Sequence, residues 1–367
     1  MRPTLTPLIA AAALSLGLSA CHDMPEYQSD MPEYQSDMLG NFDALWTAVD
    51  EHYCFFDQKG VDWNVVGQQY RAMIDDKTNV VQLFQICAGM LNTLRDGHVN
   101  LSSSFNTSYY REWWSDYPQD YDERLVQEHY LKFKYYSIGA SYYYLIGDNE
   151  DIGYLRFASF SYPLGDTSLD YIYTLLSNSG CRGLIIDIRD NGGGDMTAVE
   201  SMVSRFIDRR ILAGYICHKT GRGHNDFSEP YAFYYDPAPQ GRVRWDKPVV
   251  ILTNRSTFSA ANTFVAVMKH LPQVRIVGAP TGGGSGMPYT YELPNGWGVR
   301  MSACPVYDCD MLLTENGIAP SEGCEIGLDE DLARQGIDTM LERAMEVVNE
   351  LAPPAEAPDT EGESAAI

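Results

Sequence analysis

Positive charge is scarce in this chain: its 367 residues include 26 Lys and Arg but 50 Asp and Glu, a net charge of −24 at pH 7. Nucleic acids and anionic membrane surfaces attract basic proteins, so this balance argues against either as a partner. A Cys-x-x-Cys pair and neighbouring histidines are also missing from the sequence, and without them no metal site is expected. The apolar region from Leu8 to Leu18 is too short and too poorly flanked to span a membrane.

Several enzyme motifs are absent as well. No Gly-Lys-Ser or Gly-Lys-Thr follows the glycine-rich segment Asn191-Gly192-Gly193-Gly194, which argues against a phosphate-binding loop, and its spacing does not fit dinucleotide binding. No Gly-x-Ser-x-Gly surrounds Ser259, which argues against an esterase of the α/β-hydrolase type.

Composition favours a folded, exported protein. A hydrophobic content of 45% in 367 residues supports a sizeable core, with two folding units favoured over one. Of the 8 cysteines, an odd number follows Cys21, so at least one should be free or pair with another chain. Cys304 and Cys309 could close a short disulfide loop, since export would permit one.

The N-terminus has the pattern of an export signal. Arg2 precedes the apolar region, which ends in Leu18-Ser19-Ala20-Cys21. This ending resembles the processing box of bacterial lipoproteins, with residues 1–20 as the signal peptide and Cys21 as the lipidated residue; an ordinary secretory signal is the alternative. The resemblance implies a lipid anchor in the bacterial cell envelope, on the periplasmic face or at the cell surface.

A tandem heptapeptide follows the signal: the segment from Met24 to Asp30 is repeated from Met31 to Asp37. Two polar copies cannot build a repeat fold, so residues 21–38 are interpreted as a lipidated polar spacer between the membrane and the folded part. At the other end, the Pro-, Ala- and Glu-rich residues 352–367 are predicted to be disordered.

The segment from Thr257 to Asn262 is the most informative one. It lies where an apolar strand, Val249 to Thr253, gives way to small residues that can begin a helix. Ser259 can project its hydroxyl from such a turn, and the N–H groups that follow are free to face a reacting carbonyl. Taken alone, the pattern is more typical of a turn or a helix N-cap than of a nucleophile.

The segment from Gly183 to Gly194 complements it. Its apolar run predicts a strand buried on both faces, and Met196 to Ile207 has the apolar spacing of a helix. The Asn-Gly-Gly-Gly sequence between them predicts a turn whose N–H groups point outward without obstruction by side chains. This turn and the one at Ser259 could each supply a donor to one oxyanion hole.

Two further segments supply titratable groups. His98 lies between Leu94 and Leu101, and Glu315 precedes a turn that ends at Pro320. Either residue alone would be read as an ordinary core or surface group. Together with Ser259 and the glycine turn, however, they offer a nucleophile, a base, an acid to orient the base, and backbone donors.

In this order the segments resemble the tail-specific, or C-terminal processing, serine peptidase family. The branch that resembles tricorn and interphotoreceptor retinoid-binding protein is the most similar, and the resemblance covers residues 39–351. The family's Ser-Ala-x-Glu is present as Ser259 to Asn262, and its Ile-Val-Gly-x-x-Thr as Ile276 to Thr281. Its closing Gly-Val-x-Pro-Asp is present as Gly317 to Ser321. Asn262 and Ser321 are therefore departures from the family pattern.

A third departure concerns the catalytic base. The processing-protease branch has a lysine 25 residues after the serine, and here that position is Gly284. Lys269 is the nearest following lysine, but it lies two to three helical turns away from Ser259 and cannot return to it. The resemblance therefore implies a histidine mechanism in place of a Ser/Lys dyad.

The tricorn-like branch uses a histidine and a glutamate, and His98 and Glu315 match these positions. That branch also has a serine before its histidine that relays to the glutamate, whereas this chain has Gly97 there. Asp96 is consequently a rival for the role of orienting His98, although in an extended segment it would flank the histidine awkwardly.

The resemblance implies a serine peptidase that cleaves peptides or unfolded protein tails and needs no metal or organic cofactor. Ser259 would be the nucleophile, His98 the general base and Glu315 the group that fixes its tautomer, while Gly193 or Gly194 and Ala260 would form the oxyanion hole. A catalytically inactive ligand- or peptide-binding lipoprotein on the same fold is the alternative, because fold alone does not establish activity.

The implied fold is an α/β protein with a crotonase/Clp-protease-like ββα core. The core would occupy residues 152–351, after an N-terminal helical cap domain at 39–102. Residues 103–151 form an aromatic-rich connecting segment that is too short for a complete PDZ domain. Its aromatic cluster, from Tyr109 to Tyr121, is interpreted as packing in preference to a wall of the substrate groove.

A histidine base also predicts a pH dependence. An imidazole with its ordinary pKa of about 6.5 should give activity that rises with pH through a limb at about 6–7, set by His98.

Overall fold

The computed structural model describes residues 37–352. The predicted signal peptide, the lipidated Cys21, nearly all of the spacer and nearly all of the predicted disordered tail lie outside these residues. Within residues 37–352, no helix is both long enough and apolar enough to cross a bilayer.

The helices mostly begin after an acidic or amide side chain. Asp37, Asp62, Asn79 and Asp338 accept hydrogen bonds from the first free N–H groups of their helices, as N-caps do. The helices are α2 (Met38–His52), α3 (Phe56–Lys59), α4 (Trp63–Arg71), α5 (Val80–Asn92), α6 (Glu112–Ser115), α7 (Glu123–Leu125), the π-helix η1 (Val126–Tyr130), α8 (Asp166–Asn178), α9 (Met196–Val203), α10 (Ala260–Met268), α11 (Glu330–Ala333) and α12 (Thr339–Leu351).

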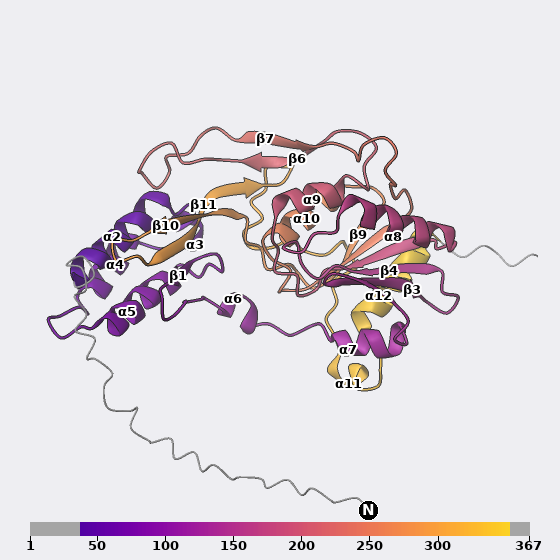
Figure 1. Ribbon diagram of the computed structural model, residues 1–367, viewed down its shortest axis with the longest axis horizontal. Coiled ribbons are helices and arrows are strands. Elements are labelled where there is room, and N and C mark those ends of the chain that lie inside the picture. The colour runs from indigo at the N-terminus through magenta and orange to yellow at the C-terminus, as the bar shows by residue number, and fades with distance from the viewer. Residues whose placement is uncertain (1–36, 353–367) are drawn as a thin grey trace, which may run out of the picture.

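A six-stranded sheet forms one end of the molecule, with strand order β2-β3-β4-β5-β8-β9 (Figure 1). From β4 to β9 the neighbouring strands are parallel, and β2 and β3 add an antiparallel edge. These strands are β2 (Tyr136–Ile138), β3 (Ser141–Ile146), β4 (Ile152–Arg156), β5 (Gly183–Asp187), β8 (Val249–Thr253) and β9 (Val274–Gly278).

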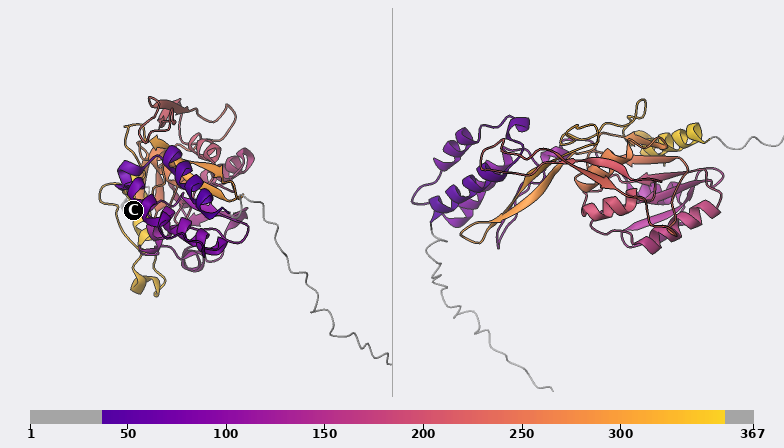
Figure 2. Two further views of the ribbon diagram at one scale, coloured as in Figure 1. Left: turned by 90° about the vertical axis from the view of Figure 1, so that its left-hand side faces the viewer. Right: turned by 90° about the horizontal axis from the view of Figure 1, so that it is seen from above.

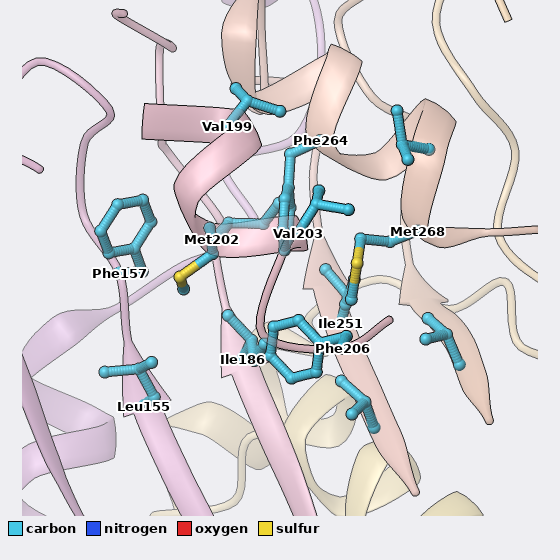
Figure 3. Packing of buried hydrophobic residues seen from close by; sticks show 14 of the residues in the cluster. Leu155, Phe157, Ile186, Val199, Met202, Val203, Phe206, Ile251, Phe264 and Met268 are labelled. Atoms are coloured by element: carbon cyan, nitrogen blue, oxygen red, sulfur yellow. The ribbon is translucent and has the colours of Figure 1, made fainter. Parts of the chain in front are cut away.

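Both faces of this sheet are covered, because its central strands alternate between two cores. Leu184 and Ile186 of β5 pack with helices α8, α9 and α10, whereas Ile185 packs with α12 on the opposite face. Every residue of β5 and β8 is buried, as the sequence predicted for strands inside a parallel sheet. Figure 3 shows the first core, where Val199, Met202 and Phe264 lie over Ile186 and Ile251.

A second sheet, with order β1-β11-β6-β7 and β10 paired to β11, links the two ends of the molecule. Its strands are β1 (Asn100–Ser102), β6 (Ile211–Ile216), β7 (Tyr231–Tyr235), β10 (Gly286–Glu292) and β11 (Gly298–Tyr307). The β10–β11 hairpin extends from the larger end to the N-terminal helices, as the view from above in Figure 2 shows. There Leu293, Trp297 and Val299 share a core with α2 and α5.

The predicted boundaries are therefore too simple in two places. The β10–β11 hairpin leaves the predicted peptidase core of 152–351, and its Leu293, Trp297, Val299 and Met301 complete the apolar core of the helical cap. Residues 136–146 were predicted to be part of a connecting segment, but β3 pairs with β4 and β2 pairs with β3, so both strands belong to the core sheet. The predicted class is confirmed: the chain is a mixed α/β protein with a small N-terminal helical region.

The cysteines differ from the sequence-based expectation. All seven in the described part are free, including Cys304 and Cys309. The two do not face each other, because the Cys304 sulfur lies 3.7 Å from His218 Nδ1 whereas Cys309 lies beside His270.

Candidate active site

Two strand ends bring the serine and the glycine turn together. Strands β5 and β8 are parallel neighbours, so the turns that follow their carboxyl ends meet at one edge of the sheet. Asn191 O accepts a hydrogen bond from Phe258 N–H (3.0 Å), which ties the glycine turn directly to the residue before Ser259. The contact places the two turns side by side, and their shared oxyanion hole stays a prediction.

Ser259 has a strained backbone. Its φ of 57° and ψ of −121° lie in a region that favours glycine, and it stands between strand β8 and helix α10. Surrounding hydrogen bonds hold this conformation: Ser259 N–H donates to Gly283 O (2.8 Å), and Ser259 O accepts from Thr263 N–H (3.0 Å). Strain of this kind at a strand-to-helix turn is typical of exposed catalytic nucleophiles.

His98 reaches Ser259 from the N-terminal end of the molecule. It lies in the loop between α5 and β1, and its Nε2 is 2.9 Å from Ser259 Oγ. This distance is that of a hydrogen bond, although 161 residues separate the two positions in the chain. The structure thus brings together the predicted nucleophile and the predicted base.

Asp96 fixes the histidine loop through the backbone. Its Oδ1 accepts a hydrogen bond from His98 N–H (2.7 Å), while Oδ2 accepts from Tyr53 OH (3.1 Å) and from Ser302 Oγ (2.8 Å). The carboxylate is buried with only 1% of its surface exposed. Three donors from three different elements therefore compensate the burial of its charge.

Burial strongly disfavours the charged form of His98. Desolvation lowers the pKa of His98 to about 4, an effect that Arg300 and Lys59 reinforce and that the negative charge of Asp96 opposes. The ring also packs against Phe258, with centroids 4.7 Å apart. A neutral imidazole is the form that can accept a proton from Ser259, so the lowered pKa favours, for a histidine base, an activity limb below the predicted pH 6–7.

Glu315 does not contact His98 in this structure. Its Oε1 pairs with Lys59 Nζ (2.9 Å) and its Oε2 accepts a hydrogen bond from Ser285 N–H (2.9 Å). Burial, and then the nearby charge of Asp96, raise the pKa of Glu315 to about 7 against the opposing effect of Lys59. The predicted direct link from Glu315 to the histidine is therefore absent, and His98 Nδ1 is a buried atom without a hydrogen-bond partner within residues 37–352.

The surroundings of Gly97 explain why this chain has no relay serine between His98 and Glu315. A Cβ atom at position 97 would lie 2.6 Å from Trp113 Nε1 and 3.0 Å from the Phe258 ring. Trp113 itself stacks on Phe258, with ring centroids 4.1 Å apart. The tryptophan occupies the space that a serine side chain would need, so the family's relay has no room here.

Two of the three predicted oxyanion donors are free. Gly193 N–H donates to Asn191 Oδ1 (3.0 Å), so it is already used within the turn. Within the described residues, no hydrogen bond involves Gly194 N–H or Ala260 N–H. A Cβ at Gly193 would lie 2.7 Å from Ala260 N and 2.8 Å from Ser259 Cβ, so only glycine lets the two turns come this close.

The family departures have structural roles. Asn262 is fully buried, and its Oδ1 accepts from Thr281 Oγ1 (2.7 Å) while its Nδ2 donates to Thr314 O (3.2 Å). It therefore joins the loops on either side of the nucleophile turn. Ser321 Oγ accepts a hydrogen bond from Ile276 N–H (2.9 Å), which anchors the final segment to β9.

The lysine position is closed. Gly284 has a φ of 77°, and any side chain there would meet the ring of Phe258. Lys269 forms an ion pair with Asp308 (2.6 Å), which occupies its ammonium group. Both observations agree with the inference that no lysine serves as the base.

A cleft of about 670 Å³ lies over Ser259 and His98. Tyr109, Tyr110, Trp113 and Trp114 line it together with the glycine turn. The preference for packing over a groove wall was therefore incomplete, since Trp113 both packs on Phe258 and faces the cleft. The sequence also missed Tyr53, Ser302 and Lys59, because nothing in their local patterns distinguishes them from ordinary helix and strand residues.

One group of side chains outside the cleft could hold a metal ion. His270, Cys309 and Asp310 place one potential ligand atom each within 4.8 Å of one another. His270 and Asp310 are exposed, and the neighbouring Asp308 carboxylate is already neutralised by Lys269. None of these three residues lines the cleft over Ser259 and His98.

Comparison with known proteins agrees with this geometry. The profile of peptidase family S41 matches residues 151–322, and the profile of the tricorn protease C1 domain matches residues 34–92. A solved structure of a presumed peptidase from Parabacteroides merdae is 42% identical, covers 90% of this chain and 99% of its own, and superimposes with a TM-score of 0.79.

Curated relatives are more distant. The chloroplastic carboxyl-terminal-processing peptidase 2 of Arabidopsis thaliana is 25% identical over 151 residues, which is 41% of this chain and 27% of its own length. The carboxy-terminal processing protease CtpA of Bacillus subtilis is 26% identical over 179 residues, which is 48% of this chain and 36% of its own length. The matches thus span well under half of these relatives. This chain belongs to peptidase family S41, a family of tail-specific proteases.

Proposed function

We propose that this chain is an exported serine-type peptidase that cleaves peptides or unfolded protein tails. The observation that carries the proposal is the hydrogen bond of 2.9 Å between His98 Nε2 and Ser259 Oγ, at the floor of a cleft. A binding protein would need neither this pairing nor a strained serine, so the geometry favours catalysis over the inactive alternative.

The proposed reaction begins at the serine hydroxyl. Ser259 Oγ attacks the peptide carbonyl carbon while its proton moves to His98 Nε2, and the same proton then passes to the leaving amine. Water hydrolyses the resulting acyl-serine in the reverse sequence of proton transfers. Because burial keeps His98 neutral above about pH 4, the base is ready to accept a proton at neutral pH.

The oxyanion would be held by Gly194 N–H and Ala260 N–H. Both donors lie beside Ser259 and neither is used elsewhere in the described chain, whereas Gly193 N–H is taken by Asn191. Removal of one such donor typically lowers turnover by about 10²–10³. Gly193 would contribute by allowing the close approach of the two turns.

The orienting role is proposed for Asp96 in place of Glu315. Asp96 binds the backbone of His98 and is the carboxylate whose charge opposes the desolvation of the imidazole. Glu315 would act on the site indirectly, by holding Lys59 and the loop at Ser285.

The location of the protein is also a proposal. The Leu-Ser-Ala-Cys box supports lipidation at Cys21 and residence in the bacterial cell envelope, on the periplasmic face or at the cell surface. Cys21→Ser should block uptake of labelled palmitate and release the chain from membrane fractions. If wild type takes up no label, the anchor is excluded.

A serine-reactive fluorophosphonate probe tests the activity directly. Wild-type protein should be labelled, and Ser259→Ala should lose the label while keeping its circular dichroism spectrum. Ser161→Ala is the matched control, because Ser161 lines the same cleft without a hydrogen bond from its hydroxyl in the described structure. Undiminished labelling of folded Ser259→Ala would remove Ser259 from the mechanism.

A further inference from the structure

The cleft above Ser259 differs in charge from the rest of the chain. The whole sequence carries a net charge of −24, yet no Asp or Glu is among the described residues that line this cleft. Two arginines, Arg111 and Arg300, are among them. A cleft of one sign on a protein of the opposite sign concentrates ligands of the complementary charge.

Arg300 has no partner of its own. Over residues 37–352, its guanidinium takes part in no hydrogen bond, ion pair or cation–π contact, although the side chain is partly buried. Asp96 attracts it electrostatically but lies beyond ion-pair distance, and the Asp96 oxygens already accept from Tyr53, Ser302 and His98.

The other buried arginines behave differently. Arg189 pairs with both Asp187 (2.6 Å) and Asp338 (2.9 Å), and Arg205 pairs with Asp166 (2.7 Å) and also with Asp170. Burying a guanidinium without a carboxylate is unfavourable, which explains these pairs. Arg300 is only partly buried, has no such partner among the described residues, and lines the cleft.

The position of Arg300 indicates which part of a substrate it would meet. Arg300 of β11 stands opposite Asn100 of β1, two residues after His98, and both side chains line the cleft. His98 is the group that would protonate the leaving amine. Because Arg300 stands beside the strand that follows His98, it would meet the leaving-group side of a substrate bound at Ser259.

We propose that Arg300 binds a carboxylate of the substrate on the leaving-group side of the scissile bond. The carboxylate would come from an acidic side chain or from a free C-terminus close to the cleaved bond. The planar guanidinium can hold either one through two parallel hydrogen bonds, which a lysine could not reproduce. This inference rests on the proposed function, since it takes Ser259 as the reacting group.

Four peptides that differ at only two points test the proposal. The residue on the leaving-group side is Glu or Gln, and the C-terminus is either free or amidated. Wild type should cleave at least one carboxylate form with kcat/KM roughly tenfold or more above the peptide with neither group, the size of a charge-assisted pair. The Glu peptide with an amidated C-terminus carries only a side-chain carboxylate, and the Gln peptide with a free C-terminus carries only a terminal one, so these two peptides distinguish the two sources.

Variants at the two arginines locate the effect. Arg300→Gln should remove the preference, with a much larger loss of kcat/KM for the carboxylate peptides than for the neutral one. Arg300→Lys should recover part of the carboxylate preference, because lysine restores the positive charge but not the two parallel N–H donors of the guanidinium. Arg111→Gln, at the exposed cleft arginine, is the control and should change the preference little. An equal loss for all four peptides in Arg300→Gln would assign Arg300 a structural role and overturn the proposal.

Binding separates this inference from the proposed function. In the Ser259→Ala variant, isothermal titration should show the same carboxylate preference, and Arg300→Gln added to it should abolish that preference. Equal affinity for all four peptides overturns the role of Arg300 even if Ser259 is labelled. A carboxylate preference in binding, without labelling of wild-type Ser259, overturns the peptidase proposal and leaves the Arg300 site standing.

Discussion

The two halves of the candidate site are held in different ways. Ser259 is positioned by backbone hydrogen bonds between turns of one sheet, with donors and acceptors that any sequence provides. His98 is positioned by a buried side-chain network, in which Asp96 accepts from Tyr53 and Ser302. The serine half therefore depends on turn geometry and glycine, whereas the histidine half depends on particular side chains from distant elements.

This difference bears on how each half tolerates change. A backbone-held turn keeps its shape when a side chain is replaced by one that accepts its φ and ψ. When one side chain of a buried network is removed, every polar atom that was hydrogen-bonded to it is left buried without a partner. Substitutions at the histidine half should consequently alter both activity and stability.

The largest expected effect is the removal of the base. His98→Ala should lower kcat/KM by about 10⁴ or more, as much as Ser259→Ala, because nucleophile and base act as a unit. The double variant should be no worse than either single one, measured with a quenched peptide under conditions where kcat/KM is observed. An additive loss in the double variant would show that the two residues do not share one step.

The next effect separates the two carboxylates. Asp96→Ala should lower turnover by about 10²–10³ and lower the free energy of unfolding by about 2–4 kcal/mol, because Tyr53, Ser302 and the His98 N–H all lose an acceptor. Glu315→Gln should lower turnover by about tenfold or less, because Glu315 contacts Lys59 and Ser285 but not His98.

Kinetics and urea unfolding of the two variants, measured side by side, decide the assignment. Restored activity in Asp96→Asn relative to Asp96→Ala would indicate that acceptor geometry matters more than charge. A large loss at Glu315 with a small one at Asp96 would return the orienting role to Glu315.

The smallest expected effect concerns stability as a function of pH. The pKa of Glu315 is raised from 4.5 to about 7 by folding, so its contribution to stability is present below about pH 4.5 and is lost as the pH rises through 7. The pKa of His98 is lowered from 6.5 to about 4, so its contribution is present above about pH 6.5 and is lost as the pH falls through 4. Between pH 4.5 and 6.5 the two contributions oppose each other.

Removing one group should therefore expose the other. In Glu315→Gln the free energy of unfolding should rise more steeply with pH from 4.5 to 6.5 than in wild type, by an amount on the order of 2 kcal/mol over the range. In His98→Ala it should instead fall relative to wild type. Denaturant titrations at a series of pH values measure how the free energy of unfolding depends on pH in each protein. The same pH dependence in wild type and in both variants would contradict the pKa shifts of Glu315 and His98. The activity limb of wild type should lie at about pH 4, well below the ordinary histidine value.

The sequence by itself determined the elements that carry the serine half. The unbroken apolar runs of β5 and β8 dictate strands buried on both faces, and the glycines after β5 dictate a turn. That β5 and β8 lie side by side, so that Ser259 meets the glycine turn, was decided by the order of the strands in the sheet. His98 and Ser259 were paired by resemblance, not by any local pattern.

Only the tertiary structure decided the surroundings of the histidine. Whether Asp96 or Glu315 approaches His98 depends on Tyr53, Ser302 and Lys59. They come from the C-cap of α2, from β11 and from α3, and their own segments carry no signal for this role. The hairpin of β10 and β11 was likewise unpredictable as part of the helical cap, because its apolar residues could face either core. Local propensity determines the secondary structure of a few consecutive residues. Burial, charge compensation and the pKa of a buried group depend on atoms that only folding brings together.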